Sequence, residues 1–190
     1  MNKISLDFFL NNNVQEIAQN LLGKKIYTNF NGKITSAIIT ETEAYQGPED
    51  KASHAYNNRR TKRTEIMYQQ GGFCYIYLCY GVHYLFNIVT NVEEIPHAVL
   101  IRSAKPFSGI EHIQSRRGDN IKLSKLLSGP GNFTKGLGIN MESNGQILNN
   151  KSIWIEETSD NITFESSPRI GIDYAGKDAL LPWRYTLNNC

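Results

Sequence analysis

The stretch KKIYTNFNGKITSAIITETEAY, residues 24–45, decides the fold of this chain. Two runs rich in β-branched and aromatic residues flank Asn31-Gly32, a dipeptide that strongly favours a two-residue β-hairpin turn. The sequence therefore predicts two antiparallel strands. Alternate side chains of a strand share a face, so Glu41, Glu43 and Tyr45 are expected on one side of the sheet.

A second hairpin is predicted by FCYIYLCYGVHYLFNIV, residues 73–89. Both faces of this segment are apolar, which is typical of buried strands, and Tyr80-Gly81 breaks it where a hairpin tip would lie. Tyr75 and Tyr77 share a face and can belong either to the core or to a pocket. A large ring at the tip must pack under another loop or project as a wedge, and wedging rings are used to open the DNA base stack.

Shorter elements surround these hairpins. Asn13 and Glu16 resemble a capping box, which predicts a helix from Val14 that stops at Gly23. Residues 46–68 form a polar loop of a length that is usually functional. Further strands are expected at 97–106 (ending at Arg102), 152–157 and 168–172, and short helices at 109–117, at 121–127 and from Pro130. We expect one mixed α+β domain over residues 1–190, with a mostly antiparallel curved sheet, flanking helices and a protruding β-hairpin.

Composition narrows the possible partners. The chain has 190 residues, 40% of them hydrophobic, which is typical of a globular protein. Its net charge of +2 is too small to indicate a class of binding partner. Basic side chains gather in two clusters, which are either solvated loops or contacts to a phosphate-bearing partner: Arg59, Arg60, Lys62 and Arg63, and Arg116, Arg117, Lys122 and Lys125.

The sequence gives little support for a bound cofactor or for a membrane-spanning segment. The three cysteines (Cys74, Cys79, Cys190) and the lack of a secretory segment or of about 20 consecutive apolar residues predict free thiols, a cytoplasmic location and no membrane partner. The four histidines fit no zinc spacing, so no metal or other cofactor is expected. GNFTKGLG, residues 131–138, lacks the Lys-Ser/Thr of a phosphate-binding loop and is better read as a helix with a glycine stop.

Glu41 and Glu43 leave two interpretations open. They are either exposed charges at a strand edge or a general base facing an aromatic cavity. Residues two apart on a strand are separated by roughly 6 to 7 Å, which also falls near the spacing of glycosidase acid pairs. A pocket with one carboxylate and several tyrosines would favour a flat, electron-poor or cationic ring beside a nucleophilic water.

Several blocks then resemble a known family. They are ETEAYQGPEDKASHA (41–55), YIYLCYGVHYLFN (75–87), VLIRSAKP (99–106), SGPGNFTKGLGI (128–139), PRIGI (168–172) and LPWRY (181–185). Together they resemble the alkyladenine, or 3-methyladenine, DNA glycosylase family of the mammalian type. The resemblance implies an enzyme that flips a damaged purine nucleotide out of double-stranded DNA and lets water cleave its N-glycosidic bond.

Residue roles follow from the resemblance alone. It implies that Glu43 activates the water and that Arg102 holds the water and the phosphate side of the flipped nucleotide. It places Tyr45, His54 and Tyr77 around the base, and makes Asn87 oppose the 2-amino group of normal guanine. Tyr80 would fill the gap left by the flipped base, and the loop cluster Arg59, Arg60, Lys62 and Arg63 would contact phosphates. Val82 and Thr64 depart from the family's usual Met and Asn.

The implied enzyme acts in base excision repair, and we expect this chain to be a monomer. No lysine falls at the matched positions, which argues against a Schiff-base lyase step and favours a monofunctional glycosylase. Two alternatives remain: a nucleoside or sugar glycosidase using Glu41 and Glu43 as an acid pair, and a protein that binds damaged DNA without catalysis.

Overall fold

The computed structural model describes residues 2–158 and 162–188. Within them an eight-stranded, antiparallel sheet runs in the order β3-β4-β5-β2-β1-β6, with β8 pairing to β2 and β7 to β8. The strands are β1 (Lys25–Phe30), β2 (Lys33–Tyr45), β3 (Cys74–Cys79), β4 (His83–Thr90), β5 (His97–Ser108), β6 (Ile153–Glu156), β7 (Phe164–Ser167) and β8 (Arg184–Leu187). The α-helices are α1 (Val14–Asn20), α2 (Ile110–Arg117) and α3 (Pro130–Leu137).

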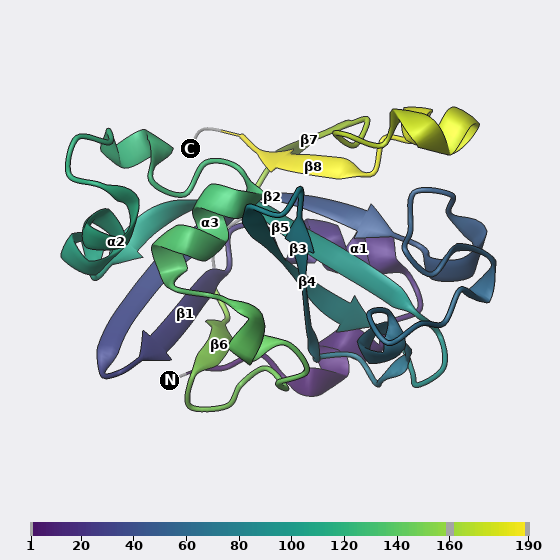
Figure 1. Cartoon of the computed structure of the whole chain (residues 1–190), viewed down its shortest axis with the longest axis horizontal. Coiled ribbons are helices and arrows are strands. Elements are labelled where there is room, and N and C mark those ends of the chain that lie inside the picture. Colours follow the sequence, from purple (N-terminus) through teal and green to yellow (C-terminus); the bar gives the residue numbers. More distant parts are fainter. Residues whose placement is uncertain (1, 159–161, 189–190) are drawn as a thin grey trace.

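The long strand β2 organises the sheet. Asn31 and Gly32 both have positive φ, 55° and 76°, as the predicted turn between β1 and β2 requires. The first half of β2 pairs with β1, and residues 41–43 pair on the same edge with β8. β5 pairs along nearly the whole of the other edge, with register shifts around Glu41. In Figure 1 the C-terminal strands therefore lie beside the end of β2 that carries the two glutamates.

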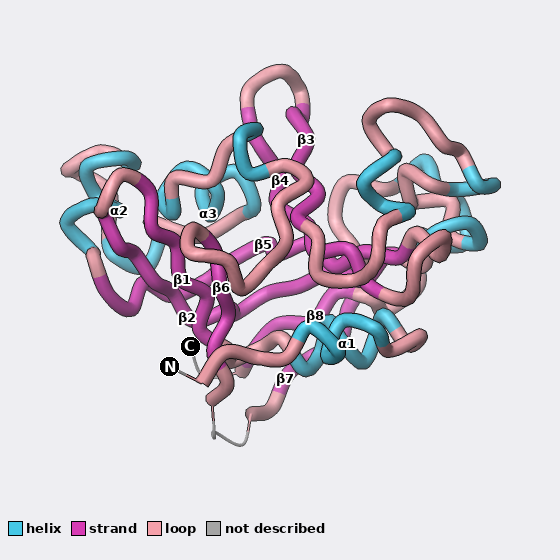
Figure 2. The backbone as a smooth tube through the Cα atoms, turned by 90° about the horizontal axis from the view of Figure 1, so that it is seen from below, coloured by secondary structure: helices cyan, strands magenta, loops and turns pink. Residues whose placement is uncertain are grey.

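The second predicted hairpin is also present. β3 and β4 pair from Cys74↔Ile88 to Cys79↔His83, and Tyr80 and Gly81 both have positive φ at the tip. Tyr80 is 89% exposed, so its ring projects and is not packed under a loop. The hairpin stands out from the body of the molecule in Figure 2.

Alternate residues of the central strands serve two purposes. Cys74 and Ile76 of β3, Phe86 and Ile88 of β4, and Val99 and Ile101 of β5 belong to the main hydrophobic core. The residues between them line a cavity, described below. The both-sided apolar pattern of these strands thus reflects a core on one face and an aromatic pocket on the other.

Most of the smaller elements agree with expectation. Asn13 caps α1 by accepting a hydrogen bond from the Glu16 N–H at 3.0 Å, and Gly138, with φ 75°, ends α3. The loop after β2 contains three 3₁₀ turns, at Gly47–Glu49, Tyr56–Asn58 and Glu65–Tyr68. Further 3₁₀ helices lie at Leu6–Leu10, Leu123–Lys125, Met141–Ser143 and Asp173–Leu180.

Three local predictions were wrong. Residues 168–172 are not a strand, because their backbone carries the side chain of Arg169 into a buried ion pair and turns at Gly171. The helix expected at 121–127 is only the 3₁₀ turn Leu123–Lys125. β5 does not end at Arg102 but continues to Ser108, because β2 supplies partners beyond that residue.

The predicted class is confirmed: the described residues form one mixed α and β unit around a curled antiparallel sheet. No helix among them is long and apolar enough to cross a membrane. Cys74 is buried and Cys79 is half-buried, both as free thiols, whereas Cys190 lies outside the described residues.

Candidate active site

A cavity of about 670 Å³ opens on the face of the sheet opposite the core. Its floor is formed by alternate residues of three strands, namely Tyr75 and Tyr77 of β3, Leu85 and Asn87 of β4, and Ala98, Leu100 and Arg102 of β5. The other walls come from Ala52–His54, from Gly129–Asn132 at the start of α3, and from Ile170–Ile172. The volume falls within the range of roughly 300 to 1,000 Å³ found for small-ligand pockets.

Glu43 lies directly behind the wall of this cavity. Its side chain is fully buried and accepts two hydrogen bonds, from the Tyr45 hydroxyl at 2.7 Å and from the Ile170 main-chain N–H at 2.8 Å. The Arg102 guanidinium lies 3.2 Å from the same oxygen that Ile170 contacts. All three partners line the cavity. The carboxylate is therefore held at a fixed place beside the pocket and not in bulk solvent.

Glu41 shares the face of Glu43, as predicted, but has different partners. Its carboxylate accepts hydrogen bonds from Arg102 at 3.0 Å, Arg184 at 3.0 Å and Ser103 at 2.7 Å. Burial opposes ionisation of Glu41, but the bonds from Ser103 and the two arginines outweigh it, so its pKa is lowered. Burial also opposes the charge of Arg102 and by itself would lower its pKa. The carboxylates of Glu43 and Glu41 outweigh burial, so the pKa of Arg102 is raised. Arg102 therefore bridges two carboxylates as a cation.

Three aromatic rings form one side of the pocket. The centroids of the Tyr75 and Tyr77 rings are 5.6 Å apart, and the His54 ring meets Tyr77 edge-on at 4.6 Å. His54 Nδ1 is hydrogen-bonded to the Tyr75 hydroxyl at 2.8 Å. Burial, together with the charges of Arg63 and Arg59, lowers the pKa of His54 to about 4. The imidazole is therefore neutral near neutral pH and is held in orientation by Tyr75.

Strand register explains how distant residues meet. Tyr75 pairs with Asn87, Asn87 with Leu100, Leu100 with Glu43, and Glu43 with Arg184. Residues opposite one another in neighbouring strands point to the same face, so this row runs from the cavity floor to the buried Glu43 and on to Arg184. Asn87 is 4% exposed and donates to the Tyr75 carbonyl at 3.1 Å, which fixes its amide at the cavity wall.

The basic loop cluster divides into two kinds of residue. Arg60 pairs with Glu65 at 2.8 Å and with Glu94 at 2.6 Å, so its charge is already compensated within the protein. No described acidic side chain pairs with Arg59, Lys62 or Arg63, and all three are exposed. Arg63 lies over the Tyr77 ring at 5.8 Å and borders the cavity.

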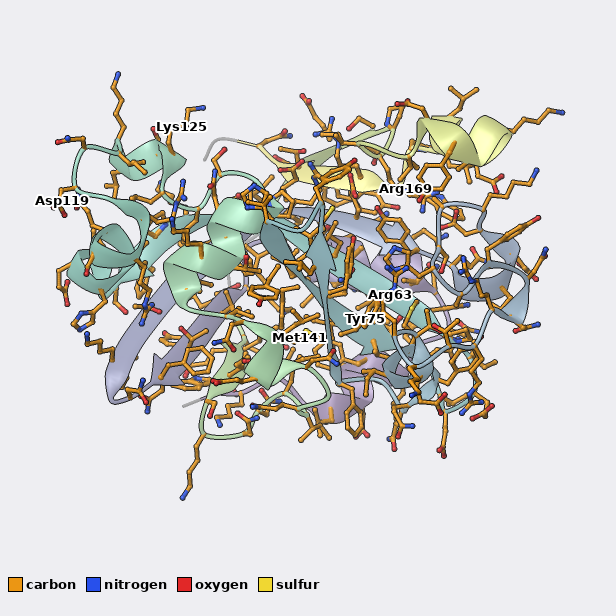
Figure 3. The ribbon with its side chains drawn as sticks, in the orientation of Figure 1. Arg63, Tyr75, Asp119, Lys125, Met141 and Arg169 are labelled. Atoms are coloured by element: carbon orange, nitrogen blue, oxygen red, sulfur yellow. The ribbon has the colours of Figure 1, made fainter. Side chains whose placement is uncertain are left out.

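Thr64, the departure from the family's usual Asn, stabilises this loop. Its hydroxyl accepts from the Thr61 N–H at 2.8 Å and donates to the Arg59 carbonyl at 2.9 Å. Of the second basic cluster, Arg116 donates to the Gly136 carbonyl and Arg117 to the Leu126 carbonyl, so both arginines support the chain around α3. Figure 3 shows Arg63, Tyr75 and Arg169 on one side of the molecule, with Asp119 and Lys125 far away at the other end.

Sequence reasoning missed several parts of the site. Arg169, Ile170 and Tyr174 come from the segment before β8, and Tyr174, 71% exposed, lines the cavity with its hydroxyl donating to the Ala52 carbonyl at 3.2 Å. In the block PRIGI, residues 168–172, the two isoleucines occupy alternate positions, a pattern that also predicts a strand. An arginine within such an apolar run was the one available sign that the segment meets a buried acid.

Comparison with known proteins decides the family. The model of the methylpurine-DNA glycosylase family matches residues 8–190. The chain belongs to this family. It is 48% identical over 182 residues to a relative from Chlamydia felis, covering 95% of this chain and 94% of the relative. Identity is 39% to relatives from Natranaerobius thermophilus, over 98% and 96% of the two chains, and from Bacillus cereus, over 93% and 92%. All three bear the provisional name 3-methyladenine DNA glycosylase.

Family membership identifies the chain as a DNA glycosylase of DNA repair, with DNA as its substrate. The resemblance seen in the sequence is thereby confirmed. The described residues contain no group of three or more His, Cys, Asp and Glu side chains arranged to hold a metal ion.

Proposed function

We propose that this chain is a monofunctional glycosylase that excises 3-methyladenine and related alkylated purines from double-stranded DNA. The observation that carries the proposal is the position of Glu43. A fully buried carboxylate, bound by Tyr45 and Ile170 and paired with Arg102, lies immediately behind a tyrosine-lined cavity of nucleotide size. The names of the relatives support the substrate class.

The hydrolytic step uses one unfilled position on Glu43. One oxygen already meets Ile170 and Arg102, whereas the other accepts only the Tyr45 hydroxyl. A carboxylate oxygen has two acceptor sites, so the second oxygen can take a proton from water. Because Glu43 is covered in the empty pocket, we place the opening of this position at the entry of the nucleotide. The water oxygen attacks the sugar carbon, its proton passes to Glu43, and the electron pair of the N-glycosidic bond leaves with the base.

The pocket walls select the base. Alkylation makes a purine cationic, which improves it as a leaving group, and a cationic ring is attracted to the faces of Tyr45 and Tyr77. Neutral His54 adds no competing charge at the ring edge. The Asn87 amide is fixed by the Tyr75 carbonyl, and we propose that it opposes the 2-amino group of an unmodified guanine. No described residue that lines the cavity is a lysine, which agrees with a hydrolase that lacks a lyase step.

DNA is held around the protruding hairpin. Tyr80, exposed at its tip, enters the base stack and fills the space of the extruded nucleotide. Arg59, Lys62 and Arg63 contact phosphates, whereas Arg60 shapes the loop through Glu65 and Glu94. We propose that the enzyme acts as a monomer.

The geometry argues against an acid pair of Glu41 and Glu43. A general acid must keep its proton near neutral pH, which requires a raised pKa. The pKa of Glu41 is instead lowered, both of its oxygens are occupied, and it does not line the cavity. A free-nucleoside glycosidase would also make no use of the exposed tip or the basic loop.

The test is a panel of duplexes, each containing one 3-methyladenine, 7-methylguanine, hypoxanthine or ethenoadenine. After incubation, hot alkali converts each abasic site into a strand break. We expect breaks at the alkylated purines and none at the same position in undamaged DNA. Tight binding to the duplexes without any break would instead indicate a damage-binding protein, and cleavage of free nucleosides alone would indicate the nucleoside enzyme.

A further inference from the structure

We propose that Arg169 is a positioning residue that fixes the orientation of Glu43 from behind the cavity wall. This inference rests on the proposed function of Glu43 and adds a residue to which that function assigns no role. Arg169 itself does not line the cavity, so any effect on excision must pass through its neighbours.

The two terminal nitrogens of Arg169 are anchored to four oxygens. Its guanidinium meets both oxygens of Asp50, at 2.5 and 2.9 Å, and neither side chain is exposed. It also donates to the Ala44 carbonyl at 2.8 Å and to the Asp178 carbonyl at 3.2 Å. A planar guanidinium that forms a two-point pair with a carboxylate has one orientation. The segment around Arg169 is thus locked to the loop that follows β2.

Two connections run from this anchor to Glu43. The first is covalent: the residue after Arg169 is Ile170, whose N–H donates to Glu43. The second is a stacking contact, because the guanidinium lies 4.7 Å from the centroid of the Tyr45 ring, whose hydroxyl donates to the other oxygen of Glu43. Each oxygen of the proposed base is therefore oriented by a group that Arg169 holds in place.

An ion pair that only joined two loops would not need the contacts that Arg169 makes with both groups that bind Glu43. Arg169 also lies 5.1 Å from the centroid of the Trp183 ring, so it contacts a second aromatic face, and its buried Nε has no hydrogen-bond partner among the described residues. A buried pair with an unsatisfied nitrogen is a costly way to join two loops. Such a pair is reasonable where a geometry must be fixed.

The experiment combines R169K with E43Q. Lysine keeps the positive charge beside Asp50 but cannot form the planar two-point contact or stack in the same way. We expect R169K to lower the single-turnover excision rate by about 10²-fold, the size of loss that follows from misplacing a catalytic group by about 1 Å. Its Kd for a duplex with an uncleavable abasic-site analogue should stay within about threefold of the parent, since Arg169 is buried and does not line the cavity.

The double variant separates positioning from general damage. If Arg169 acts through Glu43, adding R169K to E43Q should change the small residual rate by less than about twofold, because the two residues act as a unit. R117K is the matched control, since Arg117 donates to the Leu126 carbonyl away from the cavity. Should R169K not fold, as judged by thermal unfolding and near-ultraviolet circular dichroism, D50N takes its place. It keeps the guanidinium and its two carbonyl contacts but weakens the fork, and a loss of about tenfold is expected.

Three results would overturn the inference: an R169K rate equal to the parent, a loss that multiplies with that of E43Q, or a large rise in Kd with an unchanged rate. Failure of the proposed function is seen separately, as full activity of E43Q alone.

Discussion

Replacing Glu43 with glutamine removes the proposed general base while keeping its surroundings intact. The glutamine oxygen can accept from the Ile170 N–H and face Arg102, as Oε1 of Glu43 does at 2.8 and 3.2 Å. The new NH₂ group then meets the Tyr45 hydroxyl, which can accept as well as donate. Arg102 keeps its bond to Glu41. Each group around position 43 keeps a hydrogen-bond partner, and only the Tyr45 hydroxyl proton loses its acceptor, so we expect the free energy of unfolding to fall by only about 1 kcal/mol.

The loss of rate should be far larger than the loss of stability. An amide cannot accept the proton of the attacking water, and a general base contributes about 10²- to 10⁴-fold to a rate. This corresponds to about 3 to 5 kcal/mol of activation free energy. The expected result is therefore an enzyme that folds and binds the lesion duplex but hardly cuts it.

Single-turnover excision of a 7-methylguanine duplex, with enzyme in excess, measures the step directly. E41Q is the matched control, because Glu41 has the same chemistry two residues away, with its own donors in Ser103 and two arginines. We expect E41Q to lose less than about tenfold. An E43Q enzyme as fast as the parent would refute the assignment of Glu43, and equal losses in the two variants would restore the acid pair.

Further predictions concern the hairpin tip, the pocket histidine and the loop cations. Y80G should leave the free energy of unfolding unchanged or raise it by up to about 1 kcal/mol, since a non-glycine residue with φ 52° is strained, yet weaken binding of lesion DNA at least tenfold. Unchanged affinity would exclude Tyr80 as the wedge. The pKa of His54, about 4 when folded against an ordinary 6.5, means that the unfolded chain binds the proton more readily. The contribution of His54 to stability is complete above pH 6.5 and is lost as the pH falls toward 4, so thermal unfolding of H54Q should depend less on pH in this window; equal dependence would contradict the assignment. K62A should reduce the slope of log K against log salt by about one, whereas R60A should lower the unfolding temperature and leave the slope nearly unchanged. Equal salt slopes for both variants would contradict this division.

The hairpins were predictable because their signals are local. Asn31-Gly32 specifies its turn by the backbone freedom of two residues, and the run at 73–89 predicts two strands with apolar side chains on both faces. The alternation that places Glu43 and Tyr45 together follows from strand geometry alone. Which face was core and which was cavity did not follow, since tyrosines such as Tyr75 are compatible with both.

The parts that escaped prediction depend on partners far along the chain. Arg169 is buried only because Asp50, 119 residues earlier, neutralises it. Residues 168–172 have the alternation of a strand. Nothing in this segment shows that residues 41–43 of β2 pair with β8 instead. β7 (Phe164–Ser167) is short and half polar, so it carries no signal without its neighbour.

The assembly of β2 also has a consequence for the order in which the molecule matures. One donor to Glu43 is Ile170 and one donor to Glu41 is Arg184, 127 and 143 positions away, so these two contacts are among the last that a folding chain can close. A partly folded molecule would already expose Tyr80 at the hairpin tip and the basic side chains of residues 59–63, while the carboxylate of Glu43 was not yet oriented. If the proposed roles hold, such a species would bind DNA without cutting it, and the ability to create abasic sites would arise only with the completed fold.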